Sequence, residues 1–138
     1  MRGNKQHFWI DRMHDRVNAD LTCRIGPQQD TLDPVQILNL SAGGLKFSCT
    51  QETALRILPE EQHTPGLVSD VTVELRLQLP LPDRKKPAQI NCSAGVVHTE
   101  RLAQDNWHIG IQFLALREID NKALQTYIEN CKQQEEQL

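Results

Sequence analysis

The stretch VTVELRLQL, residues 71–79, carries the clearest structural signal in the chain. Apolar side chains occupy every second position and alternate with Thr72, Glu74, Arg76 and Gln78. Successive side chains of a β-strand point to opposite faces, so this alternation predicts a strand with one buried face and one solvated face. The fold is therefore expected to be built around a β-sheet that covers a core on one side.

Five further segments on both sides of this strand show weaker alternation or short apolar runs, and each is predicted to be a strand. They are residues 19–25, 35–40, 45–49, 90–96 and 107–113. From Glu118 onward the apolar residues Ile119, Leu124, Ile128 and Cys131 recur at helical spacing, which predicts one amphipathic helix. A shorter helix is expected over 51–58. About six consecutive strands closed by one helix favour a six-stranded antiparallel β-barrel with the helix on its side or mouth.

Composition limits the function further. The chain has 138 residues, 38% of them hydrophobic and 24% charged, as expected of a single globular domain. Its apolar runs fall far short of the roughly 18–20 residues that span a bilayer, so no membrane insertion is expected. The N-terminus shows no signal-peptide pattern, which predicts a cytoplasmic protein. A net charge of −3 and 4% aromatic residues disfavour nucleic-acid binding.

The residues that commonly bind metals are spread along the chain. Cys23, Cys49, Cys92 and Cys131 form no CxxC pair, and the five histidines show no HExxH or HxH spacing. We therefore expect thiols that are buried and reduced, and no metal or cofactor. Catalytic triads, phosphate-binding loops and paired acid–base residues are equally absent from the sequence, which favours a binding protein over an enzyme.

Two short motifs stand out from this background. Arg12-Met13-His14-Asp15-Arg16 is an RxxxR pair, and Asn39-Leu40-Ser41-Ala42-Gly43-Gly44 is an [D/N]xSxxG stretch between two predicted strands. The second motif is expected only about 0.02 times by chance in a chain of this composition. Taken alone, it predicts a tight hairpin turn in which Asn and Ser side chains bond their own backbone.

In this order the two motifs resemble those of the PilZ family of cyclic di-GMP receptors, whose six-stranded β-barrel ends in a helix. HIGIQF and ALQTYI, at residues 108–113 and 123–128, resemble the closing strand and helix of that family. The resemblance covers nearly the whole chain. It implies a flexible arm at 1–17 carrying RxxxR, a barrel with its helix at 18–131, and a polar tail at 132–138.

The resemblance also implies how a ligand is held. Arg12 and Arg16 would grip guanine and phosphate, while Asn39 and Ser41 hydrogen-bond the dinucleotide and Gly44 keeps the strand edge open. Guanidinium forks suit both phosphate oxygens and the O6/N7 edge of guanine.

The sequence leaves open the part that three other residues play in ligand binding. His98 is a candidate contact to a guanine, although a histidine facing solvent at a strand end is an equal alternative. Trp107 is in phase with apolar neighbours, so core packing is favoured over base stacking. Asp11 lies at a position where many family members carry an arginine or a lysine. An acidic side chain there would weaken the attraction of the site for phosphate.

The sequence thus predicts a cyclic di-GMP receptor that changes conformation to regulate a partner protein, which the sequence does not identify. A barrel that binds proteins but no nucleotide is the main alternative. An oligonucleotide-binding barrel would need aromatic residues along a basic groove, and it is poorly supported.

Overall fold

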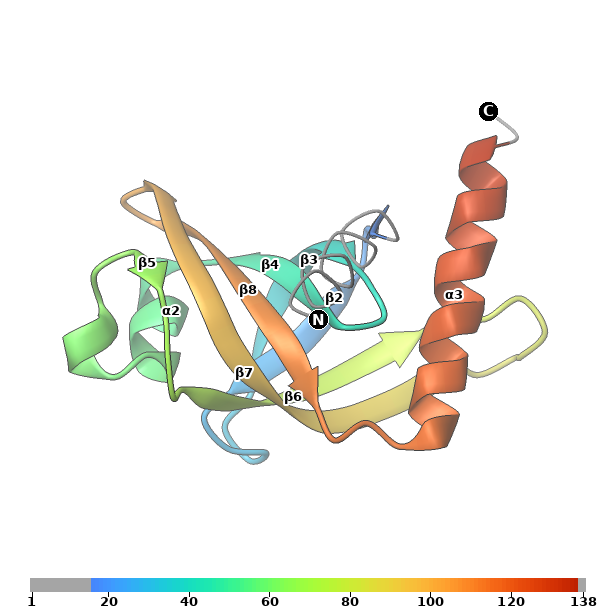
Figure 1. Cartoon of the computed structure of the whole chain (residues 1–138), viewed down its shortest axis with the longest axis horizontal. Coiled ribbons are helices and arrows are strands. Elements are labelled where there is room, and N and C mark those ends of the chain that lie inside the picture. Colours follow the sequence, from blue (N-terminus) through green and yellow to red (C-terminus); the bar gives the residue numbers. More distant parts are fainter. Residues whose placement is uncertain (1–15, 137–138) are drawn as a thin grey trace, which may run out of the picture.

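The computed structural model describes residues 16–136, and Figure 1 shows a β-barrel with a long helix beside one end. The barrel strands are β2 (Thr22–Gly26), β3 (Asp33–Leu40), β4 (Gly44–Cys49), β6 (Thr72–Leu79), β7 (Ala88–Ala103) and β8 (Asn106–Leu114). They pair antiparallel in the order β3-β2-β6-β7-β8-β4, and β4 pairs back with β3 to close the barrel. The predicted six-stranded antiparallel barrel is confirmed.

Several shorter elements accompany the six barrel strands. The strand β1 (Val17–Asn18) pairs with β3, and β5 (Gly66–Leu67) pairs with β7. Neither was predicted, because two residues are too few to show a period. The helix α2 (Gln51–Ile57) and the 3₁₀ turn η1 (Glu60–Gln62) lie at the end of the barrel opposite to α3 (Glu118–Glu136), as Figure 1 shows.

Strand β6 has one buried face and one outward face, as the alternation over 71–79 predicted. The side chains of Val73, Leu75, Leu77 and Leu79 are fully buried in β6, and the residues between them point outward. Trp107 is 2% exposed and belongs to the same core, as its phase predicted. The core is thus filled by alternating side chains from all sides of the barrel.

Two predicted boundaries differ from the structure. The helix α3 continues to Glu136, so most of the predicted polar tail is helical, and Figure 1 shows its last turns extending beyond the barrel. Val17 belongs to β1 and is buried, so this strand begins one residue before the predicted start of the barrel at residue 18. Residues 1–15, which make up most of the predicted arm, lie outside the described residues. No helix in the part described has the length and apolarity to cross a membrane.

The thiols of Cys23 and Cys92 are buried, as predicted, whereas Cys49 and Cys131 are only half-buried. Burial raises the pKa of Cys23 from 9.0 to about 12, and that of Cys92 to about 11. An unfolded chain therefore releases these protons near pH 9, while the folded chain still holds them. Their contribution to stability is complete below about pH 9 and is lost as the pH rises through the raised values.

We expect the free energy of unfolding to fall between pH 8 and pH 10 by about 1 kcal/mol for each of these two buried thiols. Urea unfolding at both pH values measures the loss. The Cys23→Ala variant isolates the cause, since its loss over the same interval should be smaller by that amount. An identical loss in the variant would show that Cys23 ionises as freely in the folded chain as in the unfolded one.

Candidate functional site

A cavity of about 240 Å³ opens on the outer surface where β3, β4, β8 and β7 lie side by side. Five of the predicted site residues line it, although they come from three separate parts of the sequence. They are Arg16, Asn39, Ser41, Gly44 and His98. Arg12 lies outside the described residues. The fold therefore brings the second motif, one arginine of the first, and the later histidine to one place.

A β-bulge in β3 turns Asn39 toward the cavity. Ile37 pairs with Phe47 of β4 while Asn39 pairs with Lys46, so one extra residue of β3 is inserted. Ile37 and Leu40 are both buried, three positions apart instead of two. The bulge thus places Asn39 on the outer face of the barrel, at a position where regular alternation from Ile37 would put it inside.

A second bulge, in β7, does the same for His98. Val96 and Thr99 are buried three positions apart, and the register shifts between Val96 and His98. Val97 and His98 consequently both lie on the outer face and both line the cavity. His98 lies inside a sixteen-residue strand and not at a strand end, although its side chain is exposed, as the solvent-facing alternative expected. The sequence did not predict this position of His98, because β7 continues to Ala103 whereas the predicted strand ended at residue 96.

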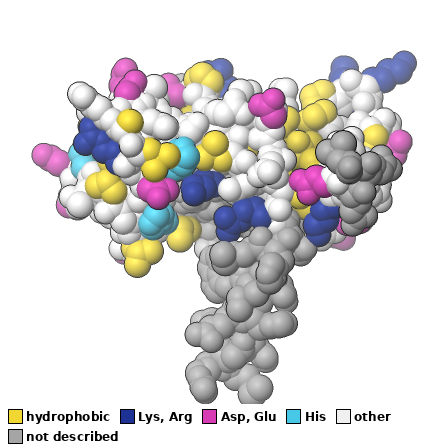
Figure 2. Space-filling view, turned by 90° about the horizontal axis from the view of Figure 1, so that it is seen from above, with side chains coloured by type: hydrophobic (Ala, Val, Ile, Leu, Met, Phe, Trp, Pro, Cys, Tyr) yellow, Lys and Arg dark blue, Asp and Glu magenta, His cyan; other side chains and the backbone are white. Residues whose placement is uncertain are grey.

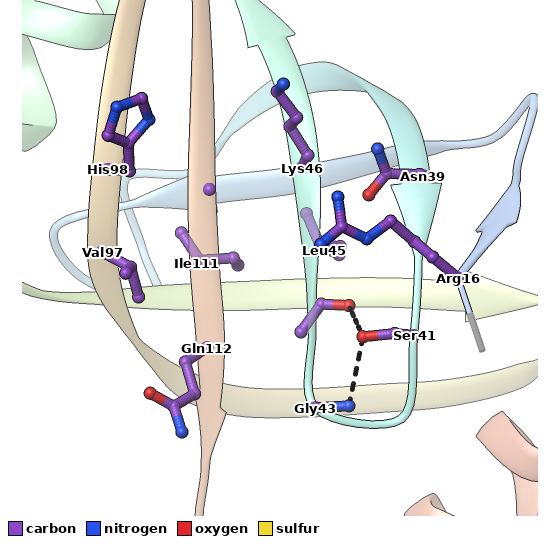
Figure 3. A pocket seen from close by; sticks show the side chains of 12 residues that line it. Arg16, Asn39, Ser41, Gly43, Leu45, Lys46, Val97, His98, Ile111 and Gln112 are labelled. Carbon is purple, nitrogen blue, oxygen red and sulfur yellow. Dashed lines mark hydrogen bonds between the residues drawn. The ribbon is translucent and has the colours of Figure 1, made fainter. Parts of the chain in front are cut away.

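The register aligns the side chains of these strands into one row. Asn39 of β3 pairs with Lys46 of β4, Lys46 pairs with Gly110 of β8, and Gly110 pairs with His98 of β7. Figure 3 shows Lys46 between Asn39 and His98, with Arg16 beside Asn39. Gly110 has no side chain, so the row is open at its centre. Lys46 was not among the predicted site residues, although its position two residues after Gly44 in an alternating strand could have suggested it.

Arg16 reaches the cavity because β1 holds the chain against β3. Val17 pairs with Leu40 and Asn18 with Asn39, so the same register extended by one residue places Arg16 beside Ser41. Its side chain is exposed and points across the cavity mouth in Figure 3. The pairing of β1 therefore anchors the C-terminal end of the RxxxR motif next to the [D/N]xSxxG turn.

Ser41 organises the turn between β3 and β4. Its hydroxyl accepts a hydrogen bond from the Gly43 amide at 3.3 Å and donates one to the Gly44 carbonyl at 3.3 Å, as drawn in Figure 3. The Ser41 amide donates to the same carbonyl at 2.9 Å. The predicted hairpin turn, in which the Ser41 side chain bonds the local backbone, is therefore confirmed. A serine hydroxyl has one donor and two acceptor positions, so one acceptor position stays open for a ligand.

We expect Ser41→Ala to lower the free energy of unfolding by about 1 kcal/mol, the typical net worth of such hydrogen bonds. The loss has a local cause, because the Gly43 amide and Gly44 carbonyl both lose their side-chain partner. Urea unfolding measures it, and Ser41→Thr, which keeps a hydroxyl, is the matched control. Equal stability of Ser41→Ala and the wild type would show that the turn needs no side-chain bonds.

Gly44 is required for a backbone contact. A Cβ atom at this position would lie 2.0 Å from the carbonyl oxygen of Ile111, in the strand that pairs with it. Only a residue without a side chain lets β4 and β8 approach this closely. Gly44 thus shapes the cavity floor through packing, which is a more structural role than keeping a strand edge open.

The charges around the cavity are mostly positive. Arg16 and Lys46 both line it, and Figure 2 shows Lys and Arg side chains gathered near the middle of the face seen from above, with histidines and an acidic side chain close by. Lys46 forms an ion pair with Glu100, whose carboxylate oxygen lies 3.8 Å from Nζ of Lys46. Within residues 16–136 no group of three His, Cys, Asp or Glu side chains could hold a metal ion. The donor set suits an anionic ligand with planar hydrogen-bonding edges.

Comparison with known proteins gives the following relatives. The family model described as PilZ domain matches residues 10–130. No curated protein matches the sequence. Similar solved structures include the Bacillus subtilis inhibitor of motility MotI/DgrA, with 19% identity and a TM-score of 0.58 over 87% of this chain and 49% of that one.

Two further solved structures carry the same fold. The K. pneumonia MrkH–c-di-GMP complex is 16% identical, with a TM-score of 0.55 over 88% of this chain and 52% of that one. The Borreliella burgdorferi PlzA protein in complex with c-di-GMP is 10% identical, with a TM-score of 0.55 over 99% of this chain and 58% of that one. The chain spans about half the length of these proteins. At identities this low, the structural similarity establishes a shared fold alone.

Proposed function

This chain belongs to the PilZ domain family, and from that membership we propose that it is a receptor for cyclic di-GMP that regulates a partner protein. The observation that carries the proposal is the convergence of both motifs on one cavity. Arg16 from the first motif and Asn39, Ser41 and Gly44 from the second line it together, and His98 joins them from a distant strand. Two of the solved structures with this fold are described as complexes with c-di-GMP.

The chemistry of the cavity fits the two kinds of group in this ligand. A phosphate needs cationic donors, which Arg16 and Lys46 supply at the cavity wall. A guanine offers the O6 and N7 acceptors, for which an arginine fork is well shaped, and amide or imidazole groups such as those of Asn39 and His98 can bind the remaining polar edge. Ser41 contributes an acceptor position, since its proton is held by the Gly44 carbonyl.

The size of the cavity points to a role for Arg12. Ligand clefts and cavities usually measure about 300–1,000 Å³, and this cavity of about 240 Å³ is smaller and open to solvent. A bound dinucleotide would be covered only in part by the described residues. Four residues of chain reach at most about 14 Å, so Arg12 stays within that distance of Arg16 and can close over the ligand. Closure of the segment 1–15 would present a changed surface to a partner protein.

Titration of the purified chain with cyclic di-GMP in a calorimeter tests the proposal. We expect saturable binding, and no comparable binding of the linear dinucleotide pGpG or of GTP, which lack the closed ring with two bridging phosphates. A folded chain that gives no heat with cyclic di-GMP would contradict the proposal, and would favour a barrel that binds proteins without a nucleotide. We propose a binding rather than a catalytic role, and a cytoplasmic one, where a nucleotide messenger is available.

A further inference from the structure

An ion pair at the cavity rim joins strands that are not neighbours. Lys46 lies on β4 and Glu100 on β7, and β8 runs between them. Nζ of Lys46 lies 3.8 Å from Oε1 of Glu100, with the side chains 36% and 48% exposed. The lysine can cross β8 because it pairs with Gly110, where no side chain blocks the path. The contact therefore depends on the register of three strands.

Of the two residues in this ion pair, only Lys46 lines the cavity. Lys46 lines it, between Asn39 and His98 in Figure 3, whereas Glu100 lies two residues beyond His98 on the same face of β7, outside the lining. The carboxylate thus holds the ammonium group from the rim. Lysine carries a compact charge on a flexible stem with three donors, so it can turn from one anion to another within its reach.

We propose that Glu100 is a built-in competitor for the ligand, which occupies Lys46 in the free protein and releases it to a phosphate of cyclic di-GMP. This inference rests on the proposed function and adds a phosphate-binding residue and an affinity-setting residue to that site. The ion pair is exposed and hence weak, so a phosphate held by several donors at once can displace the carboxylate. Because the Lys46–Glu100 ion pair must break first, the affinity for cyclic di-GMP is lower than it would be if Lys46 were free.

The proposal makes opposite predictions for the two partners. Lys46→Gln removes the charge that binds phosphate, and we expect the affinity for cyclic di-GMP to fall about tenfold. Glu100→Gln frees Lys46 from its competitor, and we expect the affinity to rise about threefold in low salt, with a smaller rise at physiological ionic strength. Both side chains are partly exposed, so the fold should survive each change.

The chain offers a matched control. Glu118 and Lys122 form a second exposed ion pair, with 3.7 Å between Nζ and Oε1, within α3 and outside the cavity lining. Glu118→Gln changes the net charge by the same amount as Glu100→Gln, and we expect it to leave the affinity unchanged. The comparison separates a local competitor from a general effect of net charge.

Calorimetric titration with cyclic di-GMP of the wild type, the three single variants and Lys46→Gln/Glu100→Gln completes the test, with circular dichroism melts to verify folding. We expect Glu100→Gln to have no effect once Lys46 is replaced. An equal rise in both backgrounds would show that Glu100 merely repels the ligand, and unchanged affinity in Lys46→Gln would show that Lys46 does not bind phosphate; either result overturns this inference alone. Absence of binding by the wild type overturns the proposed function together with it.

Discussion

Gly44→Ala is expected to destabilise the barrel by about 3 kcal/mol or more, which is a large part of the roughly 5–15 kcal/mol that stabilises a domain. The new methyl group would lie 2.0 Å from the carbonyl oxygen of Ile111 and 3.1 Å from the Cα of Gln112. Both are backbone atoms of β8, so no side chain can rotate to relieve the clash. Relief requires β4 and β8 to separate at the pair between Gly44 and Gln112, beside the cavity.

Urea unfolding followed by circular dichroism measures this loss. Gly95→Ala is the matched control, because Gly95 is also a strand residue and its added Cβ would meet nothing closer than the Val71 carbonyl oxygen at 4.0 Å. We expect the control to stay within about 1 kcal/mol of the wild type. A Gly44→Ala variant as stable as the control would contradict the close approach of the two strands.

Arg16→Ala is expected to weaken the binding of cyclic di-GMP at least tenfold while leaving the barrel intact. The variant removes charge-assisted hydrogen bonds worth roughly 1.5–3 kcal/mol. Arg16 is exposed at the cavity mouth, just before β1, so its truncation removes no core packing. We expect the free energy of unfolding to change by no more than about 0.5 kcal/mol, as is usual for surface substitutions.

The measurement is a calorimetric titration with cyclic di-GMP, and two variants sharpen it. Arg84→Ala removes an exposed arginine from the connection between β6 and β7, outside the cavity lining, and should bind as the wild type does. Arg16→Lys keeps the charge but loses the planar fork, and we expect most of the affinity to be lost. Wild-type affinity in Arg16→Ala would remove Arg16 from the proposed site.

Much of the fold follows from short-range patterns. The alternation over 71–79 predicted a half-buried strand, and Val73, Leu75 and Leu77 are indeed fully buried. The helical spacing after Glu118 predicted α3 for the same reason, since an apolar stripe needs a surface to cover it. These predictions succeed because burial of one face is encoded by neighbours two to four residues apart.

The candidate site depends less on local sequence patterns than the strands and the helix do. The motifs predicted that Arg16, Asn39, Ser41 and Gly44 belong together, but not that Lys46 and Gly110 stand between Asn39 and His98. That row exists only because β4 pairs with both β3 and β8 when the barrel closes. Residues separated by more than fifty positions become neighbours through strand register, which no local pattern reveals.

The sequence by itself determined the six barrel strands, the helix that follows them, and which turn carries the [D/N]xSxxG motif. Tertiary structure decided which face the polar residues occupy. Strict alternation from Ile37 and Val96 would have turned Asn39 and His98 toward the core, and the two bulges turn both outward into one cavity. The physical reason is that a bulge adds a residue to one strand relative to its partner, so it is defined by pairing between strands and not by the order of residues within one.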